Sequence, residues 1–385
     1  MPATVTTMPT SPRGKVVSWL SKAIREGELP RGTPVPSERK LADRLAVSRV
    51  TVKAALRDLA EMGLVDQMSS GRMRRVVAGT PQSTRASSMM QRTVAVVSTI
   101  PALDWAVPGF DAALQLDVMR KLGEAGLHAL VVSPDAADQS LIDDRPAGVL
   151  LAYRVAESVN GRDVARQCRD AGVPVVIYGD GPGLEAFDRV THDHEAGACE
   201  LTRLLIQRGC RRILRFWRFM EEHHWLDQRN VGYERALREA GLPVLPAARC
   251  PALESFGSFP QRVRAFAGFL SEHVLGDEPI DGLMLATDLH ALEAGTALKL
   301  LGKRPNEDVQ IVGYDNAWKH WRNHEPGAAD ATAPLATVDK QQDLIARNLI
   351  DLLQARRQNQ LPPSPQCRRI SPRLNVTENV PNPLS

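Results

Sequence analysis

The spacing of hydrophobic residues differs between two parts of the chain. In the N-terminal part, apolar side chains recur every three or four positions, the spacing that places them on one face of an α-helix. From Thr93 onward, short and uniformly apolar runs alternate with longer amphipathic stretches, which is typical of buried strands joined by helices. The sequence therefore predicts a helical N-terminal unit followed by a larger α/β unit.

The N-terminal pattern predicts three helices and a hairpin. Ser37 and Ser48 stand where hydroxyl groups cap the second and third helices, and Gly63 ends the third. Three helices followed by a hairpin form a winged helix-turn-helix, whose third helix enters the major groove of DNA. The first helix is expected from residue 14 to about Gly27, the second over 37–45 and the third over 48–62, with a hairpin over 64–77. The third helix is expected to bury Val52, Ala55, Leu56, Leu59 and Met62.

The α/β pattern is too long for one small sheet. Strands that alternate with helices form parallel sheets covered on both faces, and seven such strands suit two similar lobes. The expected strands are 93–98, 127–134, 147–153, 173–180, 211–216, 281–288 and 309–315. We expect a disordered tail over 1–12, a winged helix-turn-helix over 13–78, a linker over 79–92, an α/β unit over 93–375 (first lobe 93–190 and 306–335, second lobe 191–305 and 336–375) and a tail over 376–385.

Charge is distributed unevenly between these two units. The whole chain carries a formal net charge of +3, but residues 13–77 hold 14 Lys or Arg against 7 Asp or Glu. The chain from Thr93 onward is correspondingly acidic. A small basic unit joined to a large acidic one predicts two different partners, one of which is a polyanion.

The predicted third helix carries Arg49, Lys53 and Arg57 four residues apart, on the face opposite its apolar stripe. Like charges at this spacing oppose helix formation, so a phosphate backbone is a natural source of compensating charge. The alternative is a solvated basic face on an ordinary helical bundle. Arg72, Arg74 and Arg75 at the predicted wing tip, together with the charge distribution, favour DNA binding.

Several other functional classes lack their sequence signals. The five widely spaced cysteines contain no CxxC pair, the N-terminus does not resemble a signal peptide, and no run is apolar enough for a membrane helix, so we expect a cytoplasmic location. The GxxxxGK[ST], GxGxxG and GxSxG motifs are absent, and we expect neither an enzyme nor a cofactor. His192, His194, His223 and His224 do not follow a known zinc spacing, so no metal site is predicted.

Polar residues at the ends of predicted strands mark a candidate ligand site, because open α/β sheets bind ligands at this edge. Asp288 and Asp315 end two strands, and Arg229 begins a predicted helix. Trp105, in the loop after the first strand, has the flat apolar surface that suits a sugar ring. Singly, Asp288 is also explained as a helix cap and Trp105 as a packed lid; together they favour ligand binding.

The N-terminal sequence "PVPSERKLADRLAVSRVTVKAALRDLAEMGLV…GRMRRV" resembles the DNA-binding domain of the GntR family. This resemblance covers about residues 14–77. It departs from the family pattern at Val50, which replaces a threonine, and at Lys53, which replaces an arginine and so loses the bidentate fork. The resemblance implies that DNA is contacted by Arg39, Ser48, Arg49, Thr51 and Lys53 and, at the wing, by Gly71 and Arg72.

The sequences "VTHDHEAGACELTRLLIQRGCRRI", "DQRNVGYERALREAGLP" and "IDGLMLATDLHALEAGTALKLLGKRPNEDVQIVGYDN" resemble the effector domain of the LacI family. That domain shares the two-lobed fold of type I periplasmic binding proteins. The resemblance implies that Arg229 and Asp288 grip the effector, as they hold sugar hydroxyls in the sugar sensors of the family. The chain departs from the family in the loop around Trp105 and in "RFWRFMEEHHW", so the resemblance leaves the effector open.

A GntR-like reader ahead of a LacI-like sensor resembles the architecture of bacterial arabinose-type repressors. The sequence therefore predicts a transcriptional regulator, and a repressor in particular, that binds pseudo-palindromic operator DNA as a homodimer. The predicted effector is a small molecule, with a sugar preferred over a purine or another metabolite. An α/β enzyme with a DNA-binding appendage is the alternative from a different class, and no membrane partner is expected.

Overall fold

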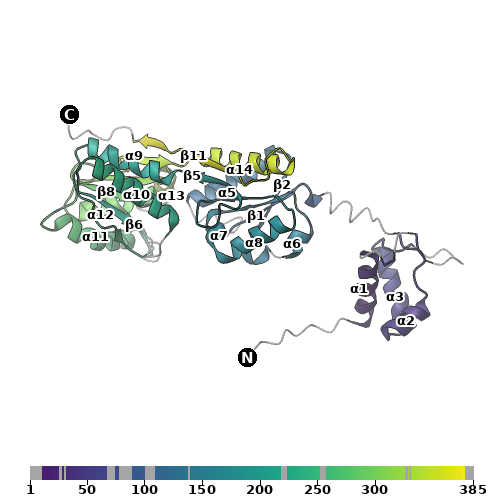
Figure 1. The fold of residues 1–385 in the computed structure, drawn as a ribbon. Helices are drawn as coiled ribbons and strands as arrows, with labels where there is room; N and C mark the ends of the chain where they lie inside the picture. Colours follow the sequence, from purple (N-terminus) through teal and green to yellow (C-terminus); the bar gives the residue numbers. More distant parts are fainter. Residues whose placement is uncertain are drawn as a thin grey trace, which may run out of the picture. The chain divides into compact units, whose positions relative to one another are not determined.

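The chain divides into two compact units, Met1–Met89 and Met90–Ser385. Figure 1 shows the first as a small helical unit in purple and the second as two lobes coloured from blue to yellow. The computed structural model describes residues 11–25, 28–29, 32–66, 74–77, 89–99, 109–137, 139–217, 223–251, 257–325, 328 and 331–377.

The N-terminal unit contains the three predicted helices, α1 (Pro12–Arg25), α2 (Glu38–Leu45) and α3 (Arg49–Glu61). Both predicted caps are present, since the Ser37 hydroxyl accepts a hydrogen bond from the Lys40 amide and the Ser48 hydroxyl accepts one from the Thr51 amide. Their core is formed by buried apolar side chains from all three helices, among them Val16, Leu20, Leu41, Leu45, Val52, Leu56 and Leu59.

The expectation that Met62 is buried is wrong. Its side chain is 48% exposed, because α3 ends at Glu61 and the chain turns at Gly63, which adopts a φ of 70°. A left-handed φ of this kind favours glycine and ends a helix. The inward face of α3 therefore stops one turn earlier than the apolar pattern suggested.

The predicted hairpin is present at its base. Val65 pairs with Val76 in antiparallel fashion, and Pro34 pairs with Arg75 on the other side. The expected wing tip, with Gly71 and Arg72, lies outside the described residues.

Arg74 and Arg75, which were expected at that tip, lie at the base of the hairpin and form hydrogen bonds within the N-terminal unit. Arg74 donates to the Leu56 carbonyl at 2.5 Å and Arg75 donates to the Gly32 carbonyl at 2.7 Å. These two guanidinium groups therefore fasten the hairpin to α3 and to the α1–α2 connection, and their assignment to the tip is wrong.

The second unit is built on two six-stranded sheets, with the orders β11-β5-β4-β3-β1-β2 and β12-β10-β9-β8-β6-β7. Pairing is parallel throughout except between β10 and β12. All seven predicted strands are confirmed, as β1 (Thr93–Val97), β2 (His128–Val132), β3 (Gly148–Leu151), β4 (Val175–Tyr178), β6 (Ile213–Trp217), β8 (Gly282–Leu285) and β9 (Gln310–Tyr314). The prediction missed β5 (Asp188–His192), β7 (Ala248–Arg249), β10 (Ala336–Asp339), β11 (Cys367–Ile370) and β12 (Arg373–Val376).

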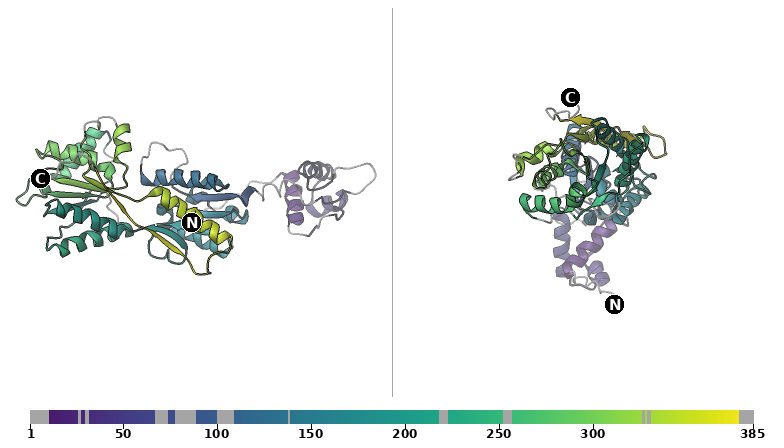
Figure 2. Two further views of the ribbon diagram at one scale, coloured as in Figure 1. Left: turned by 90° about the horizontal axis from the view of Figure 1, so that it is seen from above. Right: turned by 90° about the vertical axis from the view of Figure 1, so that its left-hand side faces the viewer.

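Helices cover both faces of each sheet, as Figure 2 shows from two further directions. The first lobe carries α5 (Phe110–Glu124), α6 (Gln139–Asp143), α7 (Tyr153–Glu157), α8 (Val159–Asp170) and α14 (Gln342–Arg357). The second carries α9 (His194–Gln207), α10 (His224–Glu239), α11 (Phe259–Leu275), α12 (Ala291–Leu300) and α13 (Trp318–His324), with 3₁₀ turns η1 (Pro134–Ala136) and η3 (Asp288–His290) in the first and second lobes. None of the described helices combines the length and apolar character needed to cross a membrane.

The chain passes between the lobes three times, which corrects the expected lobe boundaries. Strand β9 lies in the second sheet between β8 and β10, although residues 306–335 were expected in the first lobe. Conversely, α14 and β11 belong to the first lobe, although residues 336–375 were expected in the second. The chain crosses from one lobe to the other after β5, after β10 and between β11 and β12. The apolar pattern of the sequence identifies strands, but it does not show which of the two sheets each strand joins.

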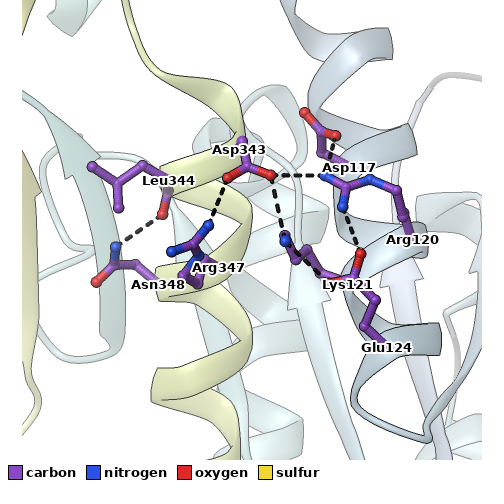
Figure 3. A network of polar contacts seen from close by, with 8 residues as sticks. All are labelled: Asp117, Arg120, Lys121, Glu124, Asp343, Leu344, Arg347 and Asn348. Atoms are coloured by element: carbon purple, nitrogen blue, oxygen red, sulfur yellow. Dashed lines mark hydrogen bonds and ion pairs between the residues drawn. The ribbon is translucent and has the colours of Figure 1, made fainter.

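Charged side chains fasten α14 to α5, which lies more than 200 residues earlier in the chain (Figure 3). Arg120 donates to Asp343 at 2.7 Å and to Glu124 at 2.6 Å, and Lys121 lies 3.5 Å from Asp343. Arg347 completes the network from α14 by donating to Asp343 at 3.0 Å. All of these side chains except the largely buried Lys121 are about half exposed, so their main contribution is to fix the relative register of the two helices rather than to add much stability.

Helices α9 and α10 approach so closely that a glycine is required. A Cβ atom at Gly232 would lie 2.0 Å from the Glu195 carbonyl oxygen. We expect Gly232→Ala to cost about 1–3 kcal/mol because the backbone of α9 has to shift. Gly268→Ala is the matched control, since this position on α11 has no atom within 4 Å and should gain about 0.5–1 kcal/mol. Urea unfolding of both variants checks the difference, and equal midpoints would refute the close contact.

Candidate DNA-binding and effector sites

The exposed face of α3 presents the residues expected to contact DNA. Arg49, Lys53 and Arg57 are all exposed, and the buried side chains Val52, Ala55, Leu56 and Leu59 occupy the opposite face, as predicted. Within the described part of the chain, none of the three cations pairs with an acidic side chain. A row of solvated cations on a winged helix-turn-helix is a surface that a phosphate backbone can neutralise.

The other expected DNA contacts gather around the start of α3. Arg39 is exposed on the preceding helix, and Val50 is 80% exposed on the first turn of α3. The hydroxyl groups of Ser48 and Thr51 lie 2.8 Å apart, so each has a partner within the domain in addition to any contact with DNA. Gly71 and Arg72 lie outside the described residues. The exposed apolar side chain of Val50 suits a thymine methyl group better than a phosphate.

The expected effector residues of the second lobe lie together at the carboxyl ends of its strands. Arg229 is buried in the second turn of α10, which begins at His224 rather than at Arg229 as expected. Its guanidinium donates to the Ala286 carbonyl at 2.7 Å and lies over two rings, 3.5 Å from the centroid of Tyr314 and 4.4 Å from that of Trp225. A cation between two aromatic faces is stabilised by both rings, so the position of Arg229 is fixed before any ligand binds.

Asp288 is fully buried and is bonded within the lobe. It opens the 3₁₀ turn after β8, accepts a hydrogen bond from the Thr337 hydroxyl at 2.6 Å and accepts another from the Ala317 amide at 3.0 Å. Burial, and then the neighbouring Asp315 carboxylate, raise the pKa of Asp288 to about 8. In this arrangement Asp288 holds the segment after β9 against β10 and so positions Asp315.

Asp315 forms an ion pair that joins two strand ends. Lys340, directly after β10, lies 2.8 Å from the Asp315 carboxylate. Burial alone would raise the pKa of Asp315, but Lys340 and Arg229 more than offset it, so the pKa lies below its ordinary value. The Lys340 ammonium also lies 3.4 Å from the centroid of Phe110, which opens α5 in the first lobe. Lys340 thus connects the polar cluster of the second lobe to the first lobe.

Two histidines stand where β5 leads into α9. The rings of His192 and His194 lie 4.9 Å apart, and both are buried. Burial, and then Lys340 and Arg229, lower the pKa of His192 to about 3, and burial acts in the same direction on the pKa of His194. Both rings are therefore neutral at physiological pH, and neither ring nitrogen of His192 has a hydrogen-bond partner among the described residues.

His192, His194, His223 and His224 do not form one cluster that could bind a metal ion. The ring of His223 stacks on Trp225 at 5.7 Å and His224 lies 3.2 Å from the amide of Gln228, whereas His192 lies against His194. Among the described residues, no group of three or more His, Cys, Asp or Glu side chains could hold a metal ion.

Polar contacts also span the two lobes beside this cluster. Gln228 of α10 donates to Asp180, which follows β4 in the first lobe, at 3.0 Å. His223 lies 3.9 Å from Glu157 at the end of α7. Together with Lys340, these contacts bring carboxylates, cations and aromatic faces side by side at the junction of the lobes, which we refer to as the cleft.

Sequence reasoning missed several members of this cleft, and the expected Trp105 lies outside the described residues. Trp225 ends the segment "RFWRFMEEHHW", which was noted only as a departure from the family pattern, and Lys340 lies in a segment for which no strand was predicted. The signal that identifies Lys340 is its place directly after an apolar strand, but β10 itself was not predicted. The signal for Trp225 is its spacing of one helical turn before Arg229, which was hidden because the helix was expected to begin at Arg229.

Because burial holds Asp288 in its protonated form, its removal should change the pH dependence of stability. Between pH 4 and 8 the unfolded chain releases this proton and the folded chain keeps it, so Asp288 progressively destabilises the fold as pH rises through this window. We expect the free energy of unfolding of Asp288→Asn, measured relative to that of the parent, to be larger at pH 8 than at pH 5. The expected increase is a few kcal/mol, since one pKa unit corresponds to about 1.4 kcal/mol. Urea unfolding at both pH values checks this, with Asp163→Asn as control, because the Asp163 side chain on α8 is 47% exposed. An unchanged difference between the two pH values would contradict it.

Two family models match the chain. One describes bacterial regulatory proteins of the gntR family and matches residues 12–72, and the other describes a periplasmic binding protein-like domain and matches residues 202–378. The HTH-type transcriptional regulator CelR of Thermobifida fusca is 29% identical over 253 residues, which are 63% of this chain and 68% of that protein. The sucrose operon repressor of Escherichia coli is 25% identical over 274 residues, 68% of this chain and 75% of that protein.

The fold is also similar to a solved structure of a regulator. The structure of the transcriptional regulator CelR in complex with cellobiose superposes with a TM-score of 0.59 at 22% identity, over 89% of this chain and 99% of that one. A helix-turn-helix unit of the gntR type precedes a periplasmic binding protein-like unit in one chain, and the relatives that match it are regulators of transcription. The chain is therefore a DNA-binding transcriptional regulator that joins a helix-turn-helix unit of the gntR type to a periplasmic binding protein-like unit.

Proposed function

We propose that this regulator is a repressor that binds a pseudo-palindromic operator as a homodimer and that a sugar bound between its lobes controls its affinity for DNA. The observation that carries the proposal is the convergence of Arg229, Asp315 and Lys340 at the carboxyl ends of the strands, next to contacts that span both lobes. A small molecule bound there touches both lobes and can therefore change the angle between them.

The DNA side of the proposal rests on the exposed cations of α3. Arg49 opens the helix, where a long side chain with a bidentate donor can reach a guanine edge in the major groove. Lys53 and Arg57 follow one and two turns later on the same face and are placed for phosphates. The homodimer is supported by Leu130 on edge strand β2, which is 39% exposed, since a second copy of the chain would cover it.

The effector side rests on the chemistry of the cleft. Carboxylates accept hydrogen bonds from ring hydroxyls, cations donate to them, and an aromatic face such as Trp225 suits the apolar face of a sugar. The similar regulator CelR has been solved with cellobiose, which supports a sugar over a purine. A purine is the second candidate, favoured only by the stacking surfaces of Trp225 and His223.

Coupling between the sites follows from the three passages of the chain between the lobes. These lie at residues 192–194, 339–342 and 370–373, and a ligand that draws the lobes together bends all three. In a dimer such a rotation changes the distance between the two reading helices. A coupling free energy of about 1–3 kcal/mol is enough to change operator occupancy several-fold.

We also propose that the chain is not an enzyme, since the relatives that match it are regulators of transcription. Among the described residues, Asp315 is paired with Lys340, and burial lowers the pKa of His192 and leaves its ring neutral. A turnover assay on the sugars of the panel below, which detects any product formed, tests this statement directly.

Fluorescence anisotropy tests the regulator itself. The full chain selects duplexes from a random pool, and the selected palindrome is then titrated with and without pentoses, hexoses, disaccharides, sugar phosphates and purines. A sugar that shifts the affinity supports the proposal and names the effector class. A shift by a purine alone would move the assignment to the second candidate, and the absence of any selected duplex would refute it.

Arg49→Ala should weaken binding to the selected operator by about 1–3 kcal/mol and relax base choice at one position, whereas Lys53→Ala should weaken all duplexes alike. Arg264→Ala is the matched control, since it removes an exposed arginine from α11 in the other unit. Anisotropy on operator and scrambled duplexes measures both effects. If Arg49→Ala weakens both duplexes equally, Arg49 contacts phosphate rather than a base.

Arg229→Lys should reduce the effector response at least ten-fold and leave DNA binding without effector unchanged. Lysine keeps the charge between Tyr314 and Trp225 but loses the planar fork that donates in two directions. Isothermal titration with the effector found above, together with operator anisotropy, measures the two properties separately. A variant with unchanged effector affinity would remove Arg229 from the site.

A further inference from the structure

The first lobe contains a cavity that is separate from the polar cluster of Arg229, Asp315 and Lys340 in the second lobe. Its volume is about 40 Å³, and it is lined by residues of β1, β3 and the end of β4 on one side and of α5 and α14 on the other. Val96, Leu114, Val118 and Leu150 give it apolar walls. Protein interiors are normally packed to the density of an organic crystal, so unfilled space of this size is uncommon. Because it lies beside the predicted ligand site, it is a candidate to bind part of the ligand.

One polar atom in the wall lacks a partner. Gln115, on α5, is 92% buried, since only 8% of its surface is exposed, and its amide oxygen has no hydrogen bond among the described residues. A buried acceptor without a donor costs about 1–3 kcal/mol. A purely apolar occupant would leave this cost in place, whereas an occupant with a hydroxyl or N–H group would remove it.

The position of the cavity in the sheet also points to a ligand. In the order β4-β3-β1-β2, the chain leaves β1 in one direction to form β2 and returns on the other side to form β3. The carboxyl ends of β1 and β3 therefore flank the point where the strand order reverses, which is where open α/β sheets bind ligands. Ser98 and Ala152, directly after β1 and β3, both line the cavity.

A chain of contacts connects the cavity to the polar cluster of the cleft. Tyr178 lines the cavity, and its ring centroid lies 6.0 Å from that of Phe110. Phe110 in turn lies beneath the ammonium of Lys340, which pairs with Asp315. These side-chain contacts place the cavity next to the charged cluster at the junction of the two lobes.

We propose that this cavity is a subsite of the effector site that takes a compact apolar group next to one hydrogen-bond donor, which binds the amide oxygen of Gln115. A water molecule needs about 10–15 Å³ of such volume, so the cavity holds roughly three or four non-hydrogen atoms. The effector is then a sugar derivative with a short alkyl-like portion beside a hydroxyl or amine, rather than a bare polyhydroxylated ring. This inference rests on the proposed function, since it places the subsite within the effector cleft.

Propan-2-ol and acetone test the subsite without knowledge of the effector. They have the same size, but only the alcohol donates a hydrogen bond. In the full chain, methyl NMR signals of Leu114, Val118 and Leu150 should shift on titration, with propan-2-ol binding at least five-fold more tightly than acetone. The signals of Leu116, on the exposed side of the same helix, should not move.

Two variants separate the contributions of shape and donor. Gln115→Met should abolish the preference for the alcohol, and Ala152→Val should weaken both probes by filling the cavity, with Leu116→Met as the matched control. Equal affinity for the two probes in the parent, or no shift of the cavity methyl groups, would overturn the proposal and leave at most a bound water at Gln115.

The same variants distinguish this proposal from the proposed function. If the probes bind as expected but no compound changes DNA affinity, the cavity exists and the regulatory role fails. If an effector is found and Gln115→Met binds it with unchanged affinity, the regulatory role stands and the subsite fails.

Discussion

The second lobe depends on the burial of one permanently charged group. The guanidinium of Arg229 is removed from water, and no residue can neutralise it by taking its proton. The structure surrounds it instead with the faces of Tyr314 and Trp225, the carbonyl of Ala286 and the ring of His194. Those groups come from β9, α10, the end of β8 and α9, so stabilising one cation fixes four elements relative to one another.

The charge of Arg229 also sets the protonation of its neighbours. Together with Lys340 it keeps Asp315 ionised and, after burial itself, keeps His192 neutral. With one carboxylate ionised, the nearby Asp288 keeps its proton more easily and can serve as a structural bracket for the segment after β9. The cleft therefore reaches a defined pattern of donors and acceptors before a ligand arrives, which lowers the entropic cost of binding.

The sequence predicted the individual helices and strands better than it predicted how they are arranged into two lobes. The helix caps Ser37 and Ser48, the apolar face of α3 and all seven predicted strands follow from local periodicity and were found. The missed strands give a weak apolar signal because they are very short, as the two residues of β7 are, or because they contain polar side chains. Strand β5 contains Asp188, Arg189 and His192, and β11 contains Cys367 and two arginines. Lobe membership of β9, α14 and β11 depends on tertiary pairing, which no local pattern encodes. For the same reason Arg229 and Asp288 were recognised by position, whereas Lys340 and Trp225, whose roles come from neighbours across the fold, were not.

The exchange of segments between lobes has a consequence for how the chain is made. The helix α14 completes the core of the first lobe, and β11 and β12 complete the edges of the two sheets, yet all three follow every other described helix and strand in chain order. Neither lobe can reach its final structure on the ribosome while this stretch remains in the exit tunnel. The N-terminal unit has no such dependence, because its core is built entirely from residues before Val77. A nascent chain therefore presents a folded DNA reader before it has a completed sensor to control it.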